Sequence, residues 1–129
     1  MLFWKLSILL TMSCIASQYD PGVMDRVIAT RQAGLTSMNL PQALPKVDGY
    51  IALESCARIG EIVRIRHEGD PWESFLVTDC SGHVETTDWM LRNNIFGEVD
   101  YETAVRWNVL GRGAKIEVLL GERRGYAYD

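Results

Sequence analysis

Two aspartates stand in stretches of this sequence that are suited to acid–base chemistry. Asp79 lies within residues 75–82 (FLVTDCSG), a stretch that predicts a strand delivering an aspartate and a cysteine to one point. Asp100 opens a predicted short helix within residues 99–107 (VDYETAVRW). A carboxyl can donate a proton near neutral pH when burial or a neighbouring carboxylate raises its pKa. If the fold brings the two side chains together, each is such a neighbour for the other.

Each aspartate also has a purely structural interpretation. Asp100 stands where a helix N-cap belongs, before a predicted helix from Tyr101 to about Val109, and such a cap stabilises a fold by ~1 kcal/mol. Asp79 is equally suited to accept backbone N–H bonds as a buried carboxylate. The sequence alone leaves the catalytic and the structural interpretations of both residues open.

The elements around these aspartates are predicted to be short strands. Val63 and Ile65 alternate with two arginines, which is the pattern of a half-buried strand. Phe75 and Val77 share one face of the next strand, and Asp79 falls on the same inward parity. Residues 114–120 have the clearest alternation, with Ala114, Ile116, Val118 and Leu120 on one face. We expect strands at residues 26–30, 50–53, 61–66, 72–78, 95–99 and 114–120.

The segments between the strands predict turns, one long loop and one or two short helices. Residues 31–46 contain Gly34, Pro41 and Pro45 and are expected to form an irregular loop. Asp88 is expected to N-cap a single turn over residues 89–92, closed by two asparagines. Short strands with turn residues at close intervals predict a mainly β fold, a small barrel of six strands.

The N-terminal residues 1–16 have the features of an export signal. Lys5 is their only charge, a short apolar run follows, and Cys14 and Ala16 are the small residues expected near a cleavage site. The run is shorter than the ~20 apolar residues of a membrane span. Cleavage after Ala16, a lipoprotein signal ending at Cys14, and a buried N-terminal strand or helix are the three alternatives. The predicted divisions are 1–16 signal, 17–49 N-terminal strand and irregular loop, 50–120 barrel core and 121–129 solvated tail.

Charge and cysteine content exclude some functions. The net charge of −4 becomes −5 without Lys5, and the basic residues are scattered, so nucleic acid is not an expected partner. If Cys14 is removed or lipidated, Cys56 and Cys80 remain as an even pair, which favours a disulfide worth ~3 kcal/mol in an exported chain. Two buried thiols are the alternative. With two isolated histidines and no CxxC spacing, we expect no zinc site, and no cofactor is predicted.

The order of these motifs resembles that of the double-psi β-barrels, which include the barwin, expansin and rare-lipoprotein-A-like domains and the three-aspartate domain of bacterial cell-wall proteins. The resemblance runs from Tyr50 to about Leu120. In the three-aspartate pattern Glu54 stands in place of the first aspartate, and Asp79 and Asp100 match the second and third. The chain departs from the pattern in Glu54 itself and in the length of residues 81–98.

The resemblance implies a glycan-directed function with Asp100 as general acid, because cleavage of a glycosidic bond needs a proton on the leaving oxygen. Asp79 is then its like-charged neighbour. Glu54, Trp89 and Tyr101 are the expected substrate-binding residues, since aromatic faces suit sugar rings. A lytic transglycosylase needs no second catalytic carboxylate, because a hydroxyl of the substrate attacks.

Three classes of function remain open on the sequence. The first is a secreted or cell-envelope enzyme that cleaves peptidoglycan or another polysaccharide. The second is a non-catalytic module that binds glycan or loosens a wall, and the third is a structural or interaction domain with no carbohydrate role. The chain is expected to be a monomer without a stable membrane span after the signal is cleaved.

Overall fold

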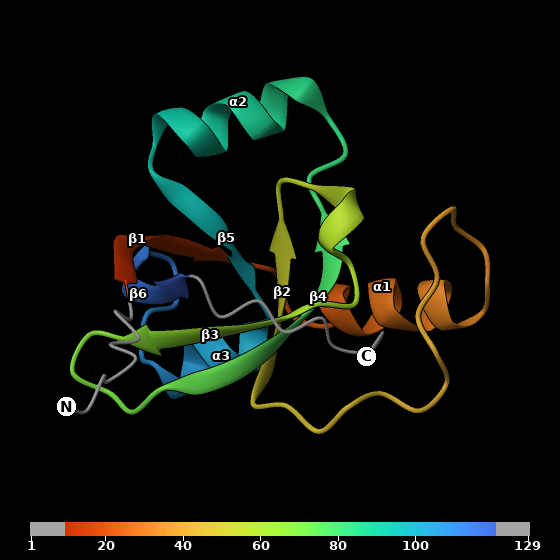
Figure 1. Ribbon diagram of the computed structural model, residues 1–129, viewed down its shortest axis with the longest axis horizontal. Coiled ribbons are helices and arrows are strands. Elements are labelled where there is room, and N and C mark those ends of the chain that lie inside the picture. The colour runs from red at the N-terminus through yellow and green to blue at the C-terminus, as the bar shows by residue number, and fades with distance from the viewer. Residues whose placement is uncertain (1–9, 121–129) are drawn as a thin grey trace, which may run out of the picture.

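A sheet of six strands forms the framework of the computed structural model, which describes residues 10–120 (Figure 1). The strands are hydrogen-bonded in the order β1-β5-β2-β4-β3-β6, and β6 returns to β1, so the sheet closes into a barrel. Three helices and one 3-10 turn connect them. The elements are β1 (Leu10–Gln18), α1 (Val23–Gln32), β2 (Gly49–Leu53), a 3-10 turn (Cys56–Arg58), β3 (Ile62–His67), β4 (Glu73–Cys80), α2 (Val84–Arg92), β5 (Ile95–Val99), α3 (Tyr101–Arg106) and β6 (Ala114–Leu120).

The two halves of the barrel repeat the same pairing pattern. β1 pairs in parallel with β5, and β2 pairs in parallel with β4. The other neighbours, β1–β6, β2–β5, β3–β4 and β3–β6, are antiparallel. If β1 is exchanged for β4, β2 for β5 and β3 for β6, each pairing becomes another pairing of the same barrel with the same direction. The sequence gives no hint of this internal relationship, because it resides in the pairing and not in repeated residues.

The barrel interior is filled by the alternating apolar side chains of the strands. Ile51, Leu53, Ile65, Phe75 and Val77 are each 0% exposed. Burying a side chain of this kind contributes roughly 1.5–3 kcal/mol, so the strand alternation is the main source of stability. The predicted strands from β2 to β6 are confirmed, with ends displaced by one or two residues.

The predicted strand at residues 26–30 is wrong, because this segment belongs to helix α1. Met24 and Ile28 lie four residues apart on the buried face of that helix. A short apolar run fits both the two-residue repeat of a strand and the 3.6-residue repeat of a helix. The helical spacing becomes visible only when Met24 is included. Thr78 of β4 donates a hydrogen bond of 3.0 Å to the Met24 sulfur, which places α1 against the outer face of the barrel.

The N-terminal strand β1 changes the expected boundaries of the core. Leu10–Gln18 lies between β5 and β6 in the barrel, and Cys14 and Ala16 are buried. The core is therefore not confined to residues 50–120. For residues 10–18, the interpretation as a buried N-terminal strand is the one that the structure shows. Cleavage after Ala16 stays a prediction; it would remove residues 10–16, which pair with β6. The first nine residues and the predicted tail at 121–129 lie outside the described residues.

Helices α2 and α3 differ in how they begin. Asp88 does not cap a helix, because α2 starts earlier, after His83, and Asp88 lies inside it. The asparagines close α2 as predicted, with Asn94 at a positive φ of 56°. Asp100 is the N-cap of α3, as expected, although this helix ends at Arg106 and not near Val109. Figure 1 shows α2 at the top of the view, at the end of the molecule away from α3.

Candidate functional site

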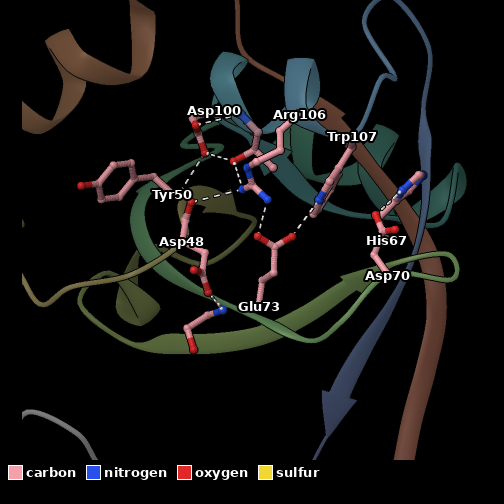
Figure 2. Close-up of polar contacts among 10 residues, drawn as sticks. Asp48, Tyr50, His67, Asp70, Glu73, Asp100, Arg106 and Trp107 are labelled. Atoms are coloured by element: carbon pink, nitrogen blue, oxygen red, sulfur yellow. Dashed lines mark hydrogen bonds and ion pairs between the residues drawn. The ribbon is translucent and has the colours of Figure 1, made fainter.

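Asp100 is buried and accepts three hydrogen bonds (Figure 2). Its side chain accepts from the backbone N–H of Tyr50 at 2.9 Å, from the Thr103 hydroxyl at 2.7 Å and from the Thr103 N–H at 3.1 Å. The residue is 6% exposed. These contacts join the start of α3 to β2 and favour the capping interpretation of Asp100.

The remaining residues of the 99–107 motif extend this structural network. Arg106 forms an ion pair with Glu73 of β4 and donates to the Asp48 carbonyl at 3.2 Å. The indole N–H of Trp107 donates to the same Glu73 carboxylate at 2.9 Å. Trp107 is also buried, as expected for a core residue. The motif therefore fixes α3 to the start of β4, as Figure 2 shows.

Asp79 has a separate set of partners, from α1 and the end of β1. One carboxylate oxygen accepts from the Tyr19 hydroxyl at 2.5 Å, and the other accepts from the Arg31 guanidinium at 2.6 Å. The side chains of Arg31 and Asp79 are 11% and 16% exposed. Among residues 10–120, Asp79 and Asp100 share no hydrogen-bond partner. The contacts therefore do not bring these two carboxylates together as the sequence predicted.

Both donors to Asp79 are themselves fixed by the backbone. The N–H of Tyr19 donates to the Val99 carbonyl at 2.8 Å, which holds the tyrosine beside the end of β5. Arg31 donates to the Met38 carbonyl at 2.9 Å, which ties α1 to the loop that follows it. Asp79 and Arg31 also line a pocket of about 240 Å³ together with Val23, Arg26, Val27, Thr30 and Thr36.

A shift of register turns Asp79 away from the barrel interior. Ile51 is paired with Val77, but the next residue, Ala52, is paired with Asp79, so β4 has one extra residue here, Thr78. Such a bulge re-aims the side chain that follows it. The predicted inward parity of Asp79 is wrong for this reason, and the carboxylate lies on the outer side with Tyr19 and Arg31.

The same register brings a second carboxyl to this site, that of Glu98. Ala52 is paired with Asp79 on one side and with Glu98 of β5 on the other. Neighbouring strands lie about 4.8 Å apart, so the backbones of Asp79 and Glu98, on either side of Ala52, are about 10 Å from each other. β5 approaches β2 closely because residue 97 is glycine; a Cβ there would lie 2.5 Å from the Ala52 carbonyl oxygen.

The environment of this site favours the protonated form of two of its groups. Burial raises the pKa of Glu98, and the charge of Asp79 raises it further, against an opposing effect of the Ser17 hydroxyl. Burial and the hydrogen bond to Asp79 also raise the pKa of Tyr19, so its phenol keeps its proton and remains the donor. We call Ser17, Tyr19, Arg31, Asp79 and Glu98 the Asp79–Glu98 site.

This site also contains polar atoms without partners. Among the described residues, the buried side-chain nitrogen and oxygen atoms that lack a hydrogen bond are Ser17 Oγ and Arg31 Nε. The Ser17 hydroxyl lies close enough to Glu98 to favour its charged form, but not in hydrogen-bonding geometry. Native proteins leave few such atoms, and both of these belong to residues of the Asp79–Glu98 site.

The expected substrate-binding residues lie elsewhere on the described surface. Glu54 lines a pocket of about 470 Å³ that also includes Cys56 and residues of α2. Trp89 of α2 is 51% exposed and lines a separate pocket of about 270 Å³. Tyr101, at the start of α3, is half-buried. None of these three is among the contacts of Asp79.

The cysteines are arranged as the sequence suggested. Cys56 and Cys80 form a disulfide that joins the 3-10 turn to the end of β4, next to Asp79. Cys14 is a buried free thiol, and burial raises its pKa to about 11, so it is poorly reactive.

Sequence reasoning missed Tyr19, Arg31 and Glu98. A signal for Glu98 was present, because it is the single charge in the strand IFGEV and stands on the face opposite to Val99. No such signal marks Tyr19 and Arg31, which reach Asp79 from positions 60 and 48 residues away.

Within residues 10–120, no three His, Cys, Asp or Glu side chains are grouped to hold a metal ion. No helix in the same range has the length and apolar character needed to cross a bilayer. Comparisons of the chain with protein-family models, curated proteins and solved structures returned no match.

Proposed function

We propose that this protein is a double-psi β-barrel of the cell envelope or the secreted space that acts on a polysaccharide such as peptidoglycan. The topology supports the first part, since a double-psi barrel is built from two interlocked halves with equivalent pairings. The barrel here has two parallel pairs, β1–β5 and β2–β4. Each pair takes the place of the other when the two halves of the barrel are exchanged.

The disulfide supports a location outside the reducing cytosol. The Cys56–Cys80 bond closes a segment of 24 residues. Such bonds persist in oxidising compartments and are rare in the cytosol.

The observation that carries the function is the presentation of Asp79. Its carboxylate is held by Tyr19 and Arg31 at the wall of a pocket on the outer side of the barrel. An oriented carboxylate stabilises the positive charge that develops on a sugar ring as a glycosidic bond breaks. Because Asp100 is engaged by three donors in the fold, we place the chemistry at Asp79 and not at Asp100.

Digestion of peptidoglycan tests this proposal. We expect the wild-type protein to release anhydromuropeptides, detected by mass spectrometry, and Asp79→Asn to reduce their rate of release at least tenfold. The matched control is Asp25→Asn, which makes the same change at an exposed position of α1. A folded wild-type protein that releases no glycan fragments would contradict an enzymatic function.

A second candidate is a non-catalytic glycan-binding module, which the exposure of Trp89 favours. Trp89 is 51% exposed, so α2 presents an aromatic side chain to solvent. Pull-down on insoluble peptidoglycan would then be lost in Trp89→Ala and retained in Asp79→Asn. Absence of both cleavage and binding would favour the third class, a structural or interaction domain.

A further inference from the structure

We infer that Glu98 is the proton donor of the Asp79–Glu98 site and that Asp79 is its ionised partner. This inference rests on the proposed function and deepens it, because it assigns the acid to a residue outside the motifs that suggested the function. It follows from the register of three strands, from the different partners of the two carboxyls and from the polar atoms left unpaired around them.

The register places the two carboxyls on either side of a small residue. Ala52 separates Asp79 from Glu98, and paired residues on neighbouring strands project to the same face of a sheet. Ile51 and Leu53 belong to the apolar core, so Ala52, which lies between them in β2, projects outward. Its cross-strand partners Asp79 and Glu98 project to the same side. A methyl group fills little of the space between the two acids. The two acids therefore lie on one face of the sheet, one on each side of Ala52.

The partners of the two carboxyls separate their roles. Asp79 accepts hydrogen bonds from a guanidinium and from a phenol, and it forms an ion pair with Arg31. Glu98 forms no ion pair with any described residue, is half-buried, and faces the negative charge of Asp79, which raises its pKa. Two carboxyls whose environments differ in this way divide into an acid and a charge stabiliser.

The chemistry that follows balances without a cofactor. Glu98 gives its proton to the glycosidic oxygen, the bond from that oxygen to the anomeric carbon breaks, and the leaving sugar departs as an alcohol. Asp79 faces the positive charge that develops on the ring. A hydroxyl of the same sugar then bonds to the anomeric carbon, and its proton passes to the Glu98 carboxylate, which restores the acid.

The alternative of a water activated by Asp79 is disfavoured by the same contacts. Both oxygens of Asp79 already accept hydrogen bonds, one from the Tyr19 hydroxyl and one from the Arg31 guanidinium, so both are engaged before a water arrives. The site therefore favours an internal attack and an anhydro product over hydrolysis.

Two measurements test the role of Glu98. The first compares peptidoglycan cleavage by the wild type, Glu98→Gln and the control Glu102→Gln, an exposed glutamate in the first turn of α3. General acid catalysis contributes roughly 10²–10⁴-fold, so we expect Glu98→Gln to lose at least a hundredfold and Glu102→Gln to stay within twofold. The second, which does not depend on activity or on the variant's folding, is an NMR titration of the Glu98 side-chain carboxyl carbon in the wild-type protein.

The outcomes separate the inference from the function on which it rests. A wild-type protein that cleaves peptidoglycan while Glu98→Gln retains activity within twofold overturns the role of Glu98 and leaves the proposed function intact. A titration midpoint at or below the ordinary glutamate value also overturns it. A midpoint above that value, with loss of cleavage in Glu98→Gln only, supports it. A wild-type protein without cleavage overturns the proposed function and this role together.

Discussion

The phenol of Tyr19 and the carboxylate of Asp79 are joined by a hydrogen bond of 2.5 Å. Tyr19 directly follows β1 and Asp79 lies near the end of β4, and these two strands correspond to each other in the two halves of the barrel. The contact therefore ties together the ends of two equivalent strands. It also orients a carboxylate that lies beside a cation, Arg31, and a second acid, Glu98.

Removing this hydroxyl tests what the contact contributes. Tyr19→Phe should lower the free energy of unfolding by about 1 kcal/mol, because it leaves an acceptor oxygen of Asp79 without its donor. Urea titration followed by circular dichroism measures the change. Tyr101→Phe is the control, since Tyr101 is half-buried and its hydroxyl makes no hydrogen bond within the described range; an equal loss in both variants would contradict the account.

Asp100 should matter for stability more than for chemistry. Asp100→Ala removes the N-cap of α3 and leaves buried donors of Tyr50 and Thr103 unpaired, so we expect a loss of about 2 kcal/mol or more. Asp88→Ala removes an exposed ion pair with Arg92 and should change stability by no more than about 0.5 kcal/mol. Thermal unfolding of both variants distinguishes them, and equal midpoints would contradict the capping role.

The disulfide should stabilise the fold and hold the end of β4 in place. The double variant Cys56→Ser, Cys80→Ser is expected to lose about 3 kcal/mol, because the bond no longer restricts the unfolded chain. Unfolding of the wild type in urea with and without reductant gives a second measure of the same effect. An unchanged midpoint after complete reduction would show that β4 is held without the bond.

Strand β1 should be essential to the barrel. A chain that begins at Ser17 lacks the residues that pair with β6 and loses the buried side chains of Cys14 and Ala16. We expect it to lose cooperative unfolding, whereas a chain that begins at Leu10 keeps the strand. A truncated chain from Ser17 with a well-dispersed NMR spectrum and cooperative unfolding would show instead that cleavage after Ala16 leaves a complete fold.

Stability should depend on pH through Glu98. Because the pKa of Glu98 is raised in the fold, the folded state binds its proton more tightly than the unfolded state. This contribution is complete below the ordinary glutamate value of about 4.3 and is lost as the pH rises through the raised value. Wild type should therefore lose more stability than Glu98→Gln over this range, as measured by urea unfolding at several pH values. Parallel curves for the two proteins would contradict the raised pKa.

The sequence predicted the elements that have strong local signals. Strands β3, β4 and β6 follow from alternation, and β2 and β5 follow from short apolar segments. Asp100 and the Cys56–Cys80 pair follow from capping chemistry and cysteine number. Helix α1 was misassigned because a short apolar run fits both strand and helix. These errors and successes depend on residues close together in the chain.

The candidate site could not be predicted in the same way, because it depends on register. A single extra residue at Thr78 turns Asp79 from the interior to the outer side. The pairing of Ala52 with both Asp79 and Glu98 then brings the carboxyls of β4 and β5, two strands that are not paired with each other, to one place. Neither effect has a signature in the spacing of residue types along the sequence.

The most direct measurement of the central claim is an NMR titration of the isotope-labelled protein with a soluble peptidoglycan fragment. The account predicts that amide shifts concentrate at Ser17, Tyr19, Ala52, Asp79 and Glu98, and that Glu98→Gln weakens them while Glu102→Gln does not. Shifts confined to α2 around Trp89, or no shifts at saturating concentrations of the fragment, would contradict the assignment of the Asp79–Glu98 site.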